Sequence, residues 1–149
     1  MRSASAEETR KLGERLAEEL RSGDVILLEG PLGAGKSEMA RGIAKGLGVR
    51  ETVTSPSVTI LNVYESGRLP LDHFDWDRLE SPEELYELGM EEHLGGDCVA
   101  LVEWPGRAAE ALPADFLMIE ILPEGENERS FRIRRHGDFR ALRWDREDD

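Results

Sequence analysis

The sequence predicts an α/β fold with a mostly parallel central sheet. Short apolar segments of the kind found in buried parallel strands alternate with segments of helical periodicity. One apolar segment, 25–28, is followed by a glycine-rich loop and by a helix with Met39, Ile43 and Leu47 on one face. This succession predicts a three-layer sandwich, in which helices cover both faces of the sheet and antiparallel hairpin or edge strands flank it.

The glycine-rich loop has the sequence GPLGAGKS over residues 30–37, which matches the Walker A pattern G-x-x-x-x-G-K-[ST]. Gly33 and Gly35 let the backbone turn its amides toward phosphate oxygens, and the helix start adds its dipole. Lys36 is expected to reach the β- and γ-phosphates, and the Ser37 hydroxyl to ligate Mg²⁺. The alternative, a glycine-rich turn that ends in Lys-Ser by chance, is disfavoured by the flanking strand and helix. The fold is therefore expected to be P-loop NTPase-like, with nucleotide contacts from Pro31, Leu32, Gly33, Ala34, Gly35, Lys36, Ser37 and Glu38.

The other elements follow from local signals. Ser5 and Glu8 form a capping box, which predicts a helix that runs to about Arg21. Ser81 as N-cap and Pro82 at the first position predict a helix that ends near Gly89. Shorter helices are expected at 90–94 and 107–112, and strands at 25–28, 58–64, 69–76, 98–102, 116–122 and 130–135. The strands at 58–64 and 69–76 are expected to form a hairpin, and the strand at 130–135 to lie at an edge.

Composition limits the class of protein. The chain of 149 residues is 39% hydrophobic and 34% charged, which is typical of one globular domain, expected over 1–149 with an acidic tail from about 144. No apolar run approaches the ~20 residues of a membrane span, and the first residues lack a signal peptide, so no membrane association and a cytoplasmic location are expected. The single cysteine, Cys98, is expected to be a buried thiol. The net charge of −13 disfavours direct binding of nucleic acid by the whole surface.

Two carboxylates are candidates for completing a hydrolytic site around Mg²⁺. Glu103 directly follows an apolar strand, where a Walker B acid lies beside the P-loop strand, although an ordinary loop carboxylate would give the same pattern. Asp75 ends the expected hairpin, but it is one of four acids between Asp72 and Glu80. Such a carboxylate would hold the metal shell or orient the attacking water.

Several other side chains have two interpretations. Thr54, Ser55 and Ser57 lie where a P-loop protein often carries a switch segment, but they could equally cap the turn at Pro56. Trp104 could pack in the core, cover the site or meet a partner. The histidines at 73, 93 and 136 lack metal-ligand spacing and are expected to be solvent-facing or satisfied. Two interpretations also apply to the arginines Arg129, Arg132, Arg134 and Arg135: they could form a phosphate clamp, or they could form the solvated face of a strand.

A series of motifs together resembles the TsaE (YjeE) family of P-loop ATPases, which serve bacterial tRNA threonylcarbamoyladenosine (t6A) synthesis. The series comprises the Walker A loop, Ser55-Pro56-Ser57, His73-Phe74-Asp75 with Arg78-Leu79, Ser81-Pro82-Glu83-Glu84-Leu85 with Gly89, and Val102-Glu103-Trp104-Pro105. The resemblance implies that the protein binds ATP and Mg²⁺ and acts on a TsaB–TsaD pair, in which TsaD transfers the threonylcarbamoyl group to N6 of tRNA adenosine 37. It also implies that tRNA is met only through these partners.

The resemblance also implies roles for individual residues. Lys36, Asp75 and Glu103 would be catalytic, with Ser37, Asp75 and Glu103 around the metal. Switch or partner roles would belong to Ser55, Ser57 and Trp104, and nucleotide contacts to Thr9 and Arg129. The chain departs from the family in having Ser57 for Thr, Val58 for an aromatic residue, Trp76-Asp77 for Leu-Tyr and Gly106 for Glu.

Two alternative functions remain at this point. A small-molecule P-loop kinase would need a lid of arginines, and the only arginine cluster lies in the expected strand at 130–135. A non-catalytic nucleotide-sensing assembly factor would bind ATP without hydrolysing it. A GTPase is disfavoured because the chain has no N-K-x-D motif. Slow hydrolysis by the isolated protein is expected, because the sequence places no obvious arginine finger.

Overall fold

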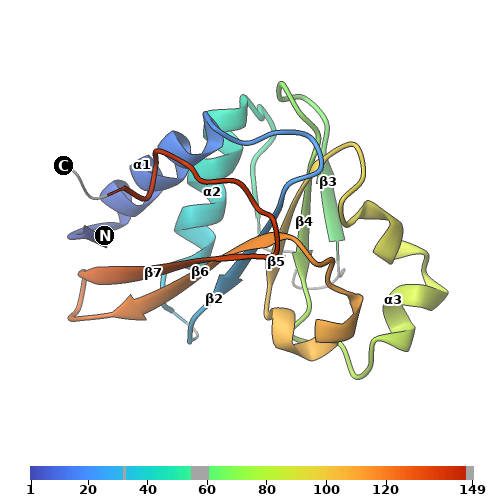
Figure 1. Ribbon diagram of the computed structural model, residues 1–149. Helices are drawn as coiled ribbons and strands as arrows, with labels where there is room; N and C mark the ends of the chain where they lie inside the picture. Colours follow the sequence, from blue (N-terminus) through green and yellow to red (C-terminus); the bar gives the residue numbers. More distant parts are fainter. Residues whose placement is uncertain (32, 55–60, 147–149) are drawn as a thin grey trace.

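The computed structural model describes residues 1–31, 33–54 and 61–146, with the backbone alone at 90 and 91. Their strands form one seven-stranded sheet in the order β1-β7-β6-β2-β5-β4-β3 (Figure 1). The strands are β1 (Arg2–Ser3), β2 (Val25–Glu29), β3 (Leu61–Tyr64), β4 (Leu71–Asp75), β5 (Val99–Glu103), β6 (Phe116–Pro123) and β7 (Arg129–His136). The helices are α1 (Ala6–Ala17), α2 (Lys36–Leu47), α3 (Glu83–Glu87) and the 3₁₀ segments η1 (Met90–His93) and η2 (Pro105–Ala111).

The four central strands run parallel to one another. β2 pairs with β6 on one side and β5 on the other, and β5 pairs with β4. The outer pairs, β3–β4, β6–β7 and β1–β7, are antiparallel. The predicted fold class, a mostly parallel centre with antiparallel edges, is confirmed. This order brings the carboxyl ends of β2, β4 and β5 to one edge of the sheet, which is where open α/β sheets bind ligands.

Helical segments cover both faces of the sheet (Figure 1). In β2, Ile26 and Leu28 pack in the apolar cluster beneath α1 and α2, whereas Val25 and Leu27 belong to the cluster on the opposite face. That second cluster includes Leu85 of α3. The alternation follows from the two-residue period of a strand, and it explains why β2 reads as a continuous apolar run.

Helix α1 ends earlier than the sequence indicated. Ser5 caps it as expected, accepting a hydrogen bond from the Glu8 amide. The helix stops at Ala17, however, because the next turn closes with i→i+3 bonds and Arg68 Nη2 donates to the carbonyls of Ala17 and Leu20 at 2.5 and 3.1 Å. A side chain distant in sequence thus caps the end of this helix.

Two smaller expectations need correction. Ser81 does not cap α3 through its side chain; Pro82 takes helical dihedrals, and the Glu84 carboxylate instead accepts the Glu80 amide at 2.6 Å. β7 is not the outermost strand, because β1 pairs along its far side. β1 has only two residues, too few to produce a recognisable alternation. The first three residues of the expected strand 58–64 lie outside the described residues.

The expected acidic tail from about 144 is wrong at its start. Trp144 is 9% exposed, and its Nε1 donates to the Leu12 carbonyl of α1 at 2.9 Å. Phe139 and Leu142 join the same cluster, so the chain through residue 144 is part of the core.

Cys98 is buried as expected, and desolvation, with Asp72 beside it, raises the pKa of its thiol to about 12. None of the helices in the described ranges is long and apolar enough to span a bilayer.

Candidate functional site

The glycine-rich loop leaves the carboxyl end of β2 in a conformation that only glycine adopts readily. Gly33 and Gly35 have φ values of +81° and +108°, and Gly35 is the N-cap of α2. Among the described residues, no side chain caps this helix, so none of them engages its first amides as a cap. A Cβ on Gly33 would meet no atom within 4 Å, which places the loop against open space. These features fit a cradle for phosphate oxygens.

Arg129 holds this loop from the neighbouring part of the sheet. Its Nε donates to the Ala34 carbonyl at 2.7 Å, and one terminal nitrogen donates to the Gly33 carbonyl at 3.2 Å. The other terminal nitrogen donates to carbonyls of the β6–β7 turn. Arg129 therefore lies beside the loop and orders the backbone that would meet the phosphates, while its predicted contact with the nucleotide stays a prediction.

Lys36, the first residue of α2, is 6% exposed and lies at the same edge. Its Nζ donates to the Gly30 carbonyl at 2.8 Å and lies 3.7 Å from the centroid of the Trp104 ring. Burial lowers the pKa of Lys36, while the charges of Glu103 and Asp75 act in the opposite direction. Trp104 thus covers the ammonium, and it also packs against the apolar cluster on its side of the sheet.

The two candidate carboxylates lie side by side. Asp75 and Glu103 are register partners at the ends of β4 and β5, and Glu103 also lies opposite Leu28 of β2. The expected position of the Glu103 strand beside the P-loop strand is confirmed. Burial raises the pKa of Asp75, and the negative charges of Glu103 and Asp77 raise it further. The Asp77 amide, which donates to the Asp75 carboxylate at 3.0 Å, acts in the opposite direction and lowers this pKa.

His73 is a functional candidate to which the sequence assigned no role. Contrary to expectation, it is neither solvent-facing nor fully satisfied within the described residues. It is 1% exposed, and its Nε2 lies 2.6 Å from a Glu103 oxygen. A carboxylate only accepts, so Nε2 carries the proton and donates. Its Nδ1 has no hydrogen-bond partner within the described part of the chain. The available signal was its spacing: His73 and Asp75 are two residues apart on a strand, so both face the same side as Glu103.

A pocket of about 350 Å³ opens beside Lys36, between the end of β2 and the turn after β5. Its walls include Glu29, Lys36, Trp104, Arg107 and Glu120. The sequence indicated only a short helix at Arg107 and did not connect this residue with the site. The one sequence feature that could have connected Arg107 with the site is its closeness to Glu103 along the chain.

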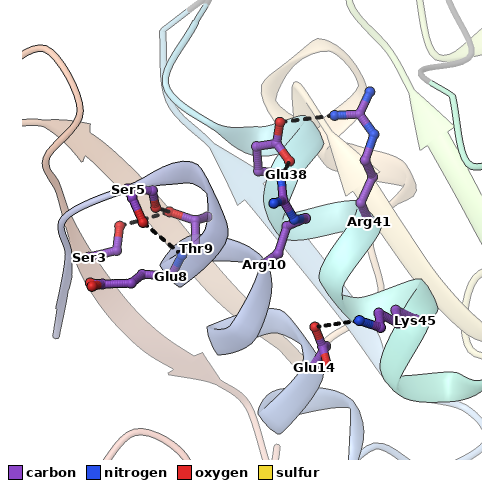
Figure 2. Close-up of polar contacts among 9 residues, drawn as sticks. All are labelled: Ser3, Ser5, Glu8, Thr9, Arg10, Glu14, Glu38, Arg41 and Lys45. Atoms are coloured by element: carbon purple, nitrogen blue, oxygen red, sulfur yellow. Dashed lines mark hydrogen bonds and ion pairs between the residues drawn. The ribbon is translucent and has the colours of Figure 1, made fainter.

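Other predicted residues in the described part of the chain do not line this pocket. The Thr9 hydroxyl is buried and bonded to Ser3 and Ser5, and Glu38 bridges Arg10 of α1 and Arg41 of α2 (Figure 2). Ser37 is the second residue of α2. Leu32, Ser55 and Ser57 lie outside the described residues. All of the predicted nucleotide contacts, those of Thr9 and Glu38 included, stay predictions.

The donor set suits magnesium better than a metal held by protein alone. Within the described ranges, no three His, Cys, Asp or Glu side chains are arranged to hold a metal ion. Mg²⁺ usually takes one or two carboxylates together with phosphate oxygens and waters. One hydroxyl, Ser37, and the two carboxylates Asp75 and Glu103 would provide that chemistry if the metal is held at the phosphate cradle.

The raised pKa of Asp75 predicts that this site lowers the stability of the nucleotide-free protein. A carboxyl with a raised folded-state pKa binds its proton more tightly when folded, so stability falls as pH rises from its unfolded to its folded pKa. We expect Asp75→Asn to raise the Tm at neutral pH in the presence of a chelator, with no gain below about pH 4. Asp97→Asn, at an exposed position, is the control. An equal or lower Tm for Asp75→Asn at neutral pH would contradict the expectation.

Comparisons with known proteins agree with the geometry. The family model described as "Threonylcarbamoyl adenosine biosynthesis protein TsaE" matches residues 3–131. The tRNA threonylcarbamoyladenosine biosynthesis protein TsaE of Bacillus subtilis is 42% identical over 128 residues, which is 86% of this chain and 80% of that protein. Its counterpart in Treponema pallidum is 40% identical over 128 residues, covering 85% and 94% of the two chains.

A solved structure gives the same result for the fold. The crystal structure of YdiB from Bacillus subtilis superposes with a TM-score of 0.81 at 37% identity, over 93% of this chain and 85% of that one. The segment matched by the family model contains Lys36, Asp75, Glu103 and Arg129, whereas Trp144 lies beyond it. The resemblance inferred from the motifs is confirmed, and the chain belongs to the TsaE family of threonylcarbamoyl adenosine biosynthesis proteins.

Proposed function

We propose that this chain is a Mg²⁺-dependent ATPase that serves tRNA t6A modification by acting on a TsaB–TsaD pair. The observation that carries the proposal is the convergence of Lys36, Asp75 and Glu103 beside an open glycine-rich loop at the carboxyl edge of the parallel strands. A lysine, a phosphate cradle and two acids at one edge are the parts that phosphoryl transfer requires.

Binding would use groups that are already in place. The amides at the start of α2 would donate hydrogen bonds to the phosphate oxygens, and Lys36 adds a positive charge. Ser37, Asp75 and Glu103 offer oxygens to the metal and its waters. Bound MgATP supplies the electrophilic γ-phosphorus and a divalent charge that offsets its oxygens.

Glu103 is the residue best placed to orient water. Its carboxylate is 4% exposed, and the hydrogen bond from His73 leaves it with one preferred orientation. Trp104 covers Lys36 and excludes solvent from the ammonium, which strengthens its interaction with an anion. In this arrangement Glu103 accepts a hydrogen bond from the attacking water, and Lys36 neutralises the charge that develops on the phosphate oxygens.

The partners follow from the family and from charge. A chain with a net charge of −13 repels a phosphate backbone, so tRNA is met through the partner proteins. Because tRNA modification in bacteria takes place in the cytoplasm, we place the activity there.

The test is Mg²⁺-dependent ATP hydrolysis by the purified protein, alone and with a TsaB–TsaD pair. We expect slow hydrolysis alone, faster hydrolysis with the pair, and a loss of about 10²-fold or more in Lys36→Ala. The control is Lys45→Ala, the same change on the same helix, because the Lys45 side chain is 74% exposed and pairs with Glu14. Its activity should equal that of the wild type.

Three outcomes would contradict the proposal. Support of t6A formation by a non-hydrolysable ATP analogue over many cycles would favour the nucleotide-sensing factor. Phosphate transfer to a nucleoside or a small alcohol would favour the kinase. Rapid hydrolysis that ignores the TsaB–TsaD pair would remove the partner from the scheme.

A further inference from the structure

We propose that Arg107 is a second cation for the terminal phosphate, and that its guanidinium binds the γ-phosphate of the triphosphate held by the P-loop. This inference rests on the proposed function and deepens it, since it assigns a further residue to the same site. It also changes an expectation from the sequence, which identified no obvious arginine finger.

The turn after β5 holds Arg107 in a defined place relative to the candidate acid. Trp104 adopts a left-handed backbone (φ 60°, ψ 50°), so the chain turns sharply directly after Glu103. The Arg107 amide then donates to the Trp104 carbonyl at 3.2 Å and closes the first turn of η2. The same short segment therefore positions Glu103, the ring over Lys36, and Arg107.

The charge lining the pocket is incomplete without Arg107. Lys36 and Arg107 both line the pocket of about 350 Å³, and they are the only cations among its described lining residues. The same walls carry Glu29 and Glu120. A triphosphate remains anionic after it binds one divalent cation. Without Arg107, Lys36 would be the only cation in the described lining to attract it, while Glu29 and Glu120 would repel it. A second cation in the lining of the same pocket provides the missing compensation.

Arg129, the arginine that holds the P-loop, is not free for this role. The three guanidinium nitrogens of Arg129 donate to carbonyls of the P-loop and of the β6–β7 turn. Arg107, by contrast, has one ion-pair partner in the described ranges, Asp77, at 3.8 Å, with the two side chains 54% and 50% exposed. Such an exposed, long pair contributes little, so a phosphate can replace it.

Guanidinium chemistry suits this position. Its planar donors match two phosphate oxygens at once, and its charge is permanent at every working pH. Asp77, which also lies near Lys36, is then the resting counter-ion that the phosphate displaces. Members of the family commonly have an aromatic residue at the position of Asp77. The Arg107–Asp77 pair is therefore a feature in which this chain departs from the family pattern.

The test compares the binding of ADP with that of a non-hydrolysable ATP analogue, both with Mg²⁺, by calorimetry. We expect Arg107→Ala to weaken binding of the ATP analogue about tenfold and to leave ADP within about twofold, because only the triphosphate reaches the second cation. Arg107→Lys should restore part of the loss. Asp77→Asn should tighten binding of the ATP analogue about two- to threefold, since it removes a competing charge. Arg21→Ala, at an exposed position before β2, should change neither affinity.

The outcomes separate this inference from the function on which it rests. Equal weakening of both ligands in Arg107→Ala, or no weakening of either, would overturn the role of Arg107 while the wild type still binds and hydrolyses ATP. If the wild type binds neither ligand, the proposed function and this inference fail together. The melting temperature of Arg107→Ala should equal that of the wild type, because the side chain is exposed.

Discussion

Glu103→Gln should lower kcat for ATP hydrolysis by about 10²–10⁴-fold while ATP affinity stays close to that of the wild type. Gln keeps the shape of the side chain, and its amide oxygen still accepts the hydrogen bond from His73 Nε2. What is lost is the negative charge, and with it the strong acceptor for the attacking water and the metal shell. The site should therefore bind nucleotide but turn it over slowly.

The measurement is single-turnover hydrolysis together with equilibrium binding, since the two separate chemistry from affinity. Glu124→Gln is the matched control: it makes the same change on a carboxylate that pairs only with Arg2 at the surface within the described residues. Activity within twofold of the wild type in Glu103→Gln would exclude Glu103 from the chemical step and leave Asp75 as the candidate.

Gly42→Ala should lower the free energy of unfolding by at least about 2 kcal/mol, even though alanine is the better helix former by about 1 kcal/mol. A Cβ at this position would lie 2.1 Å from the Arg10 carbonyl oxygen of α1. The neighbouring contacts are also close, since a Cβ on Gly13 would lie 2.7 Å from the Met39 carbonyl oxygen. The clash is with backbone, so the two helices would have to move apart.

Urea unfolding measures this effect, with Gly106→Ala as the control, because a Cβ there meets no atom within 4 Å. The change also reaches the site: α2 begins at Lys36, so a shift of this helix moves the lysine relative to Trp104. A Gly42→Ala protein with unchanged stability would show that the contact between α1 and α2 adapts without cost.

The sequence predicted the parts of the site that are continuous along the chain. The P-loop, the strand before it and the helix after it occupy neighbouring residues, and the loop conformation depends on glycines that the pattern displays directly. Glu103 was also predictable, because an acid directly after a buried strand must lie at the carboxyl edge of a parallel sheet. The rest of the pattern identified the family.

Only the tertiary structure showed which distant side chains meet. The bond between His73 and Glu103 depends on the register of β4 against β5, and the close approach of α1 to α2 depends on which turns of the two helices face each other. Trp144 is buried against α1, where its indole N–H donates to the carbonyl of Leu12, a residue more than a hundred positions earlier in the chain. The periodicity of a sequence encodes local backbone conformation and the apolar face of each element. Strand order, register and side-chain contacts arise from packing between elements, so only the folded chain determines them.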